Sequence, residues 1–176
     1  MTQTETSSEG GAFAALTAQI AALQGGAVRA GHLDLGPDLW LSADPGGRAT
    51  LTCQPEEGRM VLRLEAGDSG AWSALGLRLP VETLARGRYL GLMVEATARG
   101  ALSFTPTLRY VAGGGGTVDV APPEPVVLAG GPRRHLAWLP LDRDRLAASR
   151  ACELNLFFHN DTMQLEIARL EPLLIL

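Results

Sequence analysis

The sequence contains no lysine, and all fifteen of its basic residues are arginine. A Schiff-base amine, a lysine general base and the lysine of a P-loop are therefore excluded, so the glycine run at 113–116 indicates a flexible hairpin loop. The formal net charge of −4 disfavours nucleic acid or an acidic membrane surface as the main partner. No apolar run approaches the ~18 residues of a membrane span. We expect neither nucleic acid nor a membrane as a partner.

Cysteine is scarce as well, with Cys53 and Cys152 alone, each within an apolar alternating pattern. The apolar stretch 12–23 follows a segment that carries Glu5 and Glu9 and no arginine, whereas a signal peptide needs a basic beginning. We therefore expect a cytoplasmic protein with two buried free thiols rather than a disulfide.

The chain divides into three parts. Residues 1–11 are polar, which predicts a disordered tail. Residues 12–25 are predicted to form a helix with an apolar stripe at Phe13, Leu16, Ile20 and Leu23, ended by glycines. We expect this stripe to pack on its own domain; the alternative is a partner helix, which would make the protein a homo-oligomer.

From residue 32 the apolar period changes to two. About ten short segments alternate apolar and polar side chains, among them "RMVLRLE", "RYLGLMVEA" and "CELNLFF", and Gly, Pro, Asp or Asn separates them. Such regular short segments are typical of an antiparallel sandwich or barrel. Residues 30–176 are therefore predicted to form one β-sandwich domain.

The order of these segments resembles a known architecture. "LGLRLPVETLARGRYLGLMVEATA" is followed by "TLRYV", "RRHLAWLPLD" and "LNLFFHND", and the chain closes with "LEIARLEPLLI". This order is similar to the jelly-roll sandwiches of carbohydrate-binding modules and galactose-binding-like domains, over roughly residues 30–176. The resemblance implies an all-β jelly-roll sandwich and favours sugar binding. We expect no cofactor; the alternative is a structural Ca²⁺ at a sandwich edge, which related modules often carry.

Catalytic motifs are weak in this sequence. "GDSG" at 67–70 matches the nucleophile segment of trypsin-like proteases, but His32 lies too close upstream, and the four residues suit a turn between strands. The three histidines are scattered, and Asp142 and Asp144 lack the further ligands of a calcium loop. An enzyme is accordingly the third-ranked hypothesis.

The candidate ligand site consists of side chains that point away from the core. In "CELNLFFH", Cys152, Leu154, Leu156 and Phe158 face inward, so their neighbours face outward. Aromatic rings stack on sugars and planar polar groups bind hydroxyls. The predicted ligand-binding residues are Trp72, Tyr89, Arg109, Asn155, Phe157, His159 and Glu166. Asn160 and Asp161 suit a turn, and Phe104 and Trp138 are expected to be core rings.

Two functions remain in view. The first is a non-catalytic module that binds a carbohydrate or glycan-like ligand on one sheet face. The second is an interaction or structural domain that associates through its N-terminal helix or an exposed sheet face. The pattern leaves open which strands belong to which sheet, and therefore which outward side chains share a surface.

Overall fold

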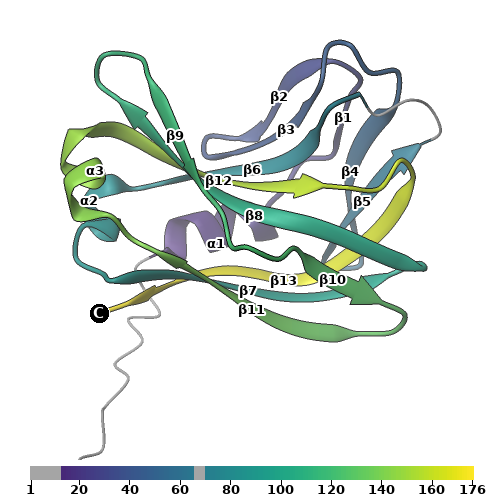
Figure 1. Cartoon of the computed structure of the whole chain (residues 1–176). Coiled ribbons are helices and arrows are strands. Elements are labelled where there is room, and N and C mark those ends of the chain that lie inside the picture. Colours follow the sequence, from purple (N-terminus) through teal and green to yellow (C-terminus); the bar gives the residue numbers. More distant parts are fainter. Residues whose placement is uncertain (1–12, 66–69) are drawn as a thin grey trace, which may run out of the picture.

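The part of the chain that the structure describes folds into two packed antiparallel β-sheets with one longer helix, α1, and two short ones, α2 and α3 (Figure 1). The structure is a computed structural model that describes residues 13–65 and 70–176. The predicted all-β jelly-roll sandwich with a short N-terminal helix is confirmed. The polar tail 1–11 and most of the "GDSG" segment lie outside the described residues.

Within the described residues, six strands form sheet 1 and seven form sheet 2. Sheet 1 has, in spatial order, β1 (Gly26–Val28), β4 (Thr50–Glu56), β5 (Arg59–Glu65), β13 (Met163–Ile175), β7 (Tyr89–Ala98) and β11 (Arg133–Pro140). Sheet 2 has β10 (Val126–Ala129), β8 (Ala101–Ala112), β12 (Ser149–Phe158), β6 (Ser73–Leu79), β3 (Leu39–Ala43) and β2 (Gly31–Gly36), while β9 (Thr117–Val120) pairs with β8.

The core lies between the sheets and consists mainly of leucine. Most strands contribute alternate residues, such as Leu90, Leu92 and Val94 of β7, which are almost fully buried. Burying one such side chain contributes roughly 1.5–3 kcal/mol, so the period of two drives the assembly of both sheets. Cys53 and Cys152 are buried in this core as free thiols, which confirms the prediction for them.

A two-residue turn joins β4 to β5. Its central residues, Glu57 and Gly58, have φ of 50° and 76°. Two consecutive positive φ angles are the requirement of a type I′ turn, whose twist matches that of the flanking strands. This turn sets the register of β4 against β5, which places Cys53 and Leu62 opposite one another in the core.

The N-terminal helix packs against its own sandwich. Helix α1 (Ala14–Ala21) and its flanks bury Phe13, Leu16 and Leu23, and Ile20 is partly buried against the same core. The helix ends before the residue 25 that we predicted, because its cap at Ala22 already closes the last turn. No helix among the described residues is long and apolar enough to cross a membrane.

Helices α2 (Val81–Leu84) and α3 (Arg143–Ala148) are short connectors. Oδ1 of Asp142 accepts hydrogen bonds from the amides of Asp144 and Arg145, at 3.0 and 3.1 Å, and so caps α3. Asp142 therefore serves as a helix cap here. Among residues 13–65 and 70–176, no group of three or more His, Cys, Asp or Glu side chains is arranged to hold a metal ion.

Candidate functional site

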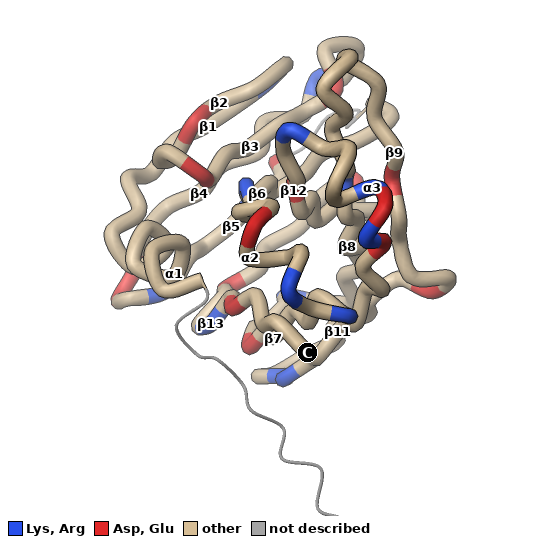
Figure 2. The backbone as a smooth tube through the Cα atoms, turned by 90° about the vertical axis from the view of Figure 1, so that its left-hand side faces the viewer, with Lys and Arg blue, Asp and Glu red and all other residues tan. Residues whose placement is uncertain are grey.

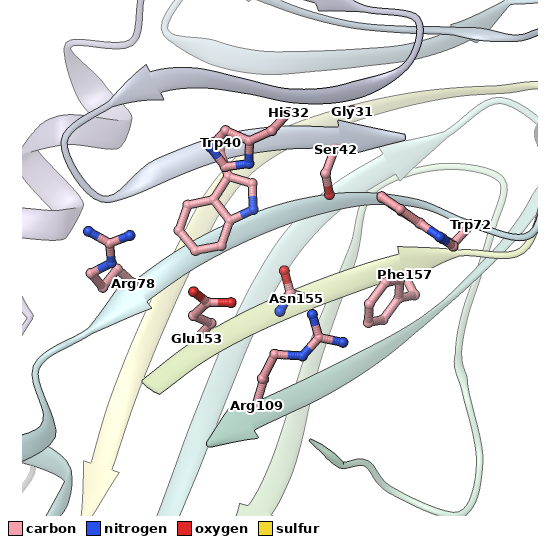
Figure 3. A pocket seen from close by; sticks show the side chains of 10 residues that line it. All are labelled: Gly31, His32, Trp40, Ser42, Trp72, Arg78, Arg109, Glu153, Asn155 and Phe157. Atoms are coloured by element: carbon pink, nitrogen blue, oxygen red, sulfur yellow. The ribbon is translucent and has the colours of Figure 1, made fainter. Parts of the chain in front are cut away.

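A cleft of ≈ 540 Å³ lies on the outer face of sheet 2. Figures 1 and 2 show β9 on one side and the β2–β3 hairpin on the other side of β6 and β12, whose outer faces form the floor. The cleft is lined by Gly31, His32, Trp40, Ser42, Trp72, Arg78, Arg109, Glu153, Asn155 and Phe157 (Figure 3).

The register of sheet 2 arranges these side chains in three rows across the strands. The charged row is Asp119, Arg109, Glu153 and Arg78, in β9, β8, β12 and β6. The middle row is Thr107, Asn155, Gly76 and Trp40, and the third is Thr105, Phe157, Ala74, Ser42 and His32. Because side chains alternate between faces, residues that are two apart in each strand share this surface.

Trp40 forms the wall of the cleft on the β3 side. It pairs across the strands with Gly76, where an added Cβ would overlap the indole ring, so the ring lies directly against the backbone of β6. The guanidinium carbon of Arg78 lies 6.0 Å from the ring centroid, and the ring of His32 lies 5.6 Å away at a tilt of 34°. Only 6% of the surface of Trp40 is exposed. Trp40 therefore shapes the wall of the cleft but offers little ring surface for a ligand to stack on.

Asn155 lies at the centre of the floor. Its side chain is 4% exposed, and its Nδ2 atom is buried with no hydrogen-bond partner among the described residues. A buried donor without a partner costs about 1–3 kcal/mol, so such groups are rare unless a ligand or water binds them. Figure 3 shows this amide between Trp40 and Phe157, on the side of β12 that faces the cleft.

The side-chain charges of the charged row add up to zero. Nε and Nη2 of Arg109 each donate to a different carboxylate oxygen of Asp119 at 2.8 Å, which is the strong two-pronged arrangement. These hydrogen bonds raise the pKa of Arg109, which therefore stays charged. Glu153 lies between Arg109 and Arg78 as their cross-strand neighbour. The two positive and two negative charges cancel, so this end of the cleft offers donors and acceptors without a net charge.

The turn after β12 closes the end of the cleft at which Phe157 lies. Asn160 accepts from the Ser103 amide at 2.9 Å and donates to the Ala101 carbonyl at 3.1 Å. Nε2 of His159 lies 2.7 Å from the Thr105 hydroxyl. Asn160 thus ties the turn to β8, and His159 sits beside Thr105 at the rim rather than in the cleft lining.

The structure brings together four of the seven predicted ligand-binding residues: Trp72, Arg109, Asn155 and Phe157 line the cleft. Tyr89 in β7 and Glu166 in β13 belong to sheet 1, so our expectation that they share a face with Phe157 is wrong. Both point outward as predicted, but outward from the opposite sheet. The alternation specifies the face of a strand and carries no information about which sheet the strand joins.

Trp138 requires a second correction, because it is 45% exposed and is no core ring. In β11 the buried residues are Ala137 and Leu139, so the residue between them points outward from sheet 1. It pairs with Gly91, and an added Cβ there would lie 2.8 Å from Cζ3 of the indole. The apolar run around Trp138 concealed the phase of this strand.

The predicted set left out six of the ten lining residues: Gly31, His32, Trp40, Ser42, Arg78 and Glu153. Of these, Trp40, with its cross-strand partner Gly76, shapes the wall of the cleft. The signal was present in "DLWLS", where Leu39 and Leu41 face the core and Trp40 must face away. Gly76 in "ALGLRL" occupies an outward position in the same way. Their mutual contact follows only from the pairing of β3 with β6, which are separated by two strands of sheet 1 in the sequence.

No protein-family model matches this chain, and no curated protein sequence matches it. Solved structures do resemble it. The xylan-binding CBM22-1 domain of Paenibacillus barcinonensis Xyn10C superposes with a TM-score of 0.52 at 12% identity, covering 86% of this chain and 92% of that one. The family 11 carbohydrate-binding module of Clostridium thermocellum Lic26A-Cel5E gives 0.51 at 10% identity, covering 85% and 97%.

The N-terminal cellulose-binding domain of Cellulomonas fimi β-1,4-glucanase C gives a TM-score of 0.50 at 15% identity, with 77% of this chain and 90% of that one covered. In all three comparisons the superposition covers at least 77% of this chain and 90% of the other module. The chain therefore has the jelly-roll β-sandwich fold of carbohydrate-binding modules, as the order of its strands predicted.

Proposed function

We propose that this protein is a non-catalytic module that binds a carbohydrate in the cleft of sheet 2. The observation that carries the proposal is Asn155, a residue of the cleft lining whose buried Nδ2 has no hydrogen-bond partner among the described residues. A hydroxyl of a bound sugar would accept from this donor and remove the cost of its burial. The likeness to xylan- and cellulose-binding domains supports the proposal through the fold they share.

The other side chains of the cleft suit the same kind of ligand. Trp72 and Phe157 are partly exposed and offer ring faces to the apolar side of a pyranose, each contact contributing roughly 0.5–1.5 kcal/mol beyond area burial. Glu153 and Arg78 supply an acceptor and a donor for hydroxyl groups. Because the charged row cancels, a neutral polyhydroxyl ligand enters without a net electrostatic penalty. We infer that the cleft binds a neutral glycan chain weakly rather than an ion.

The test is a glycan-array screen followed by titration calorimetry with the best ligand. Trp72→Ala and Phe157→Ala should each weaken binding severalfold or more, and Asn155→Leu should abolish it. Trp138→Ala is the matched control, because it removes an exposed indole from the opposite sheet. Equal losses in Trp72→Ala and Trp138→Ala would contradict the cleft as the site, as would binding that survives Asn155→Leu.

The alternative, association with a protein partner, has one observation in its favour. Tyr89 of β7 and Trp138 of the edge strand β11 are 46% and 45% exposed on the outer face of sheet 1. The stripe of helix α1 no longer supports this alternative, because the helix packs its buried side chains into its own sandwich. Ultracentrifugation of the wild type and of Trp138→Ala measures it directly: association that is lost in the variant would favour a partner on sheet 1.

A further inference from the structure

A second cavity, of ≈ 790 Å³, lies next to the cleft, between helix α1 and strand β2. His32 and Arg78 line both hollows, so the two meet at these side chains. Figure 3 shows Arg78 beyond Trp40, at one end of the cleft. A ligand chain that passes Arg78 and leaves the cleft at this end therefore enters the second cavity.

This cavity is built into the fold. Nε2 of Gln19 donates to Oδ2 of Asp38 at 3.0 Å, and its Oε1 accepts from the Asp38 amide at 3.0 Å. The Asp38 carbonyl in turn accepts from the Arg78 amide at 2.9 Å. Gln19 thus joins helix α1 to the β2–β3 turn, and that turn is joined to β6. These bonds hold the helix at a fixed place beside the sheet, so the cavity is formed before any ligand arrives.

The cavity presents polar groups that suit hydroxyls. Gln24 is exposed, and no other described residue binds its side-chain amide. Asp34 uses Oδ1 in a 2.8 Å contact with Nε2 of His32, which leaves its second carboxylate oxygen for another donor. Arg78 extends its guanidinium past Trp40 without a carboxylate partner among the described residues. One amide, one carboxylate and one guanidinium are the planar groups that bind sugar hydroxyls in pairs.

We propose that the cavity between α1 and β2 is an accessory subsite, which takes further residues of the same glycan chain that occupies the cleft. This inference rests on the proposed function and adds a ligand-length preference to it. Gln24 and Asp34 supply polar groups to the subsite alone, since neither lines the cleft. The N-terminal helix then has a role in ligand binding as well as in packing.

The test is calorimetry with linear xylo- and cello-oligosaccharides of two to eight residues, the ligand types named for two of the similar structures. For the wild type, affinity should keep rising after the cleft is filled. Gln24→Ala should remove that further gain, a loss of roughly three- to tenfold for the longest oligosaccharides and none for the shortest, as expected for one hydrogen bond. Because Gln24 is exposed, this variant should melt like the wild type.

Gln164→Ala, on the outer face of sheet 1, is the matched control and should bind every length as the wild type does. An affinity that levels off as soon as the cleft is filled would overturn the accessory subsite, as would an equal loss for short and long ligands in Gln24→Ala. Binding of no oligosaccharide or array glycan at all would instead overturn the proposed function, so the two failures are distinguishable.

Discussion

The indole of Trp40 lies against the backbone of Gly76, its cross-strand partner, because glycine leaves no Cβ in the space that the ring occupies. Gly76→Ala would place a methyl group inside the ring, and the buried Trp40 has little room to move away. We expect this variant to lower the free energy of unfolding by about 1–3 kcal/mol, the usual cost of overpacking, and to distort the cleft. Urea denaturation measures the loss.

Gly91→Ala is the natural comparison. It places the same methyl group against Trp138, whose exposed ring can swing into solvent. The loss of stability should therefore be clearly smaller than in Gly76→Ala. An equal loss in both variants would mean that confinement of the Trp40 ring is not what sets the cost.

We expect replacement by leucine to have opposite effects on stability at Asn155 and at Asn160. Asn155→Leu removes a buried donor that has no partner, so stability should stay the same or rise, by at most the roughly 1–3 kcal/mol that such a donor costs. Asn160→Leu removes the hydrogen bonds to Ser103 and Ala101 and should lower stability. Thermal melts of both variants provide the measurement. A strongly destabilised Asn155→Leu would show that this amide serves the fold rather than a ligand.

The two thiols should be inert in the folded protein. Burial raises the pKa of Cys53 to about 12 and that of Cys152 to about 11, so neither forms thiolate near neutral pH. An alkylating reagent at pH 8 should label them only as fast as the protein unfolds. Rapid labelling of either thiol in the native state would contradict its burial.

The same shifts predict a pH dependence of stability. The pKa values of the folded thiols lie above the ordinary thiol pKa of 9.0, so the folded state binds these protons more tightly than the unfolded state. The thiols' contribution to the free energy of unfolding is therefore constant below about pH 9 and is lost as the pH rises toward 11 to 12. Unfolding free energies measured from pH 8 to 11 should fall more steeply for the wild type than for the Cys53→Ala, Cys152→Ala double variant. Parallel curves would indicate that other groups cause the loss.

Truncation of Phe104 and of Trp138 should show how the loss of stability differs between a buried and an exposed aromatic ring. Phe104 is almost fully buried and meets the ring of Phe158 edge-on, with centroids 6.3 Å apart. Phe104→Ala should cost about 3–5 kcal/mol of stability, the range for large aromatic truncations in a core. Trp138→Ala should cost far less, since nearly half of the indole is already in water. Guanidinium denaturation of both variants tests the contrast, and a similar cost would place Trp138 in a covered site.

Patterns along single strands could be predicted well for this chain. The alternation in "CELNLFFH" correctly assigned Leu154 and Leu156 to the core and Asn155 and Phe157 to the outer face. It succeeded because side-chain direction in a strand is a local property of the backbone. It failed at Trp138, where apolar residues occupy both phases of β11 and hydrophobicity no longer marks the inner one.

The class of the fold, the helix at its start, the burial of both cysteines and the faces of most strands could all be predicted from the amino-acid sequence, because each follows from short-range periodicity. Which outward faces share one surface became evident from the strand order of the folded protein. β12 lies between β8 and β6, so Asn155 and Phe157 join Arg109 and Trp40 in one cleft, while β7 and β13 carry Tyr89 and Glu166 to the other sheet. That choice depends on long-range strand pairing and on how the two sheets bury their leucines together, which no local pattern encodes.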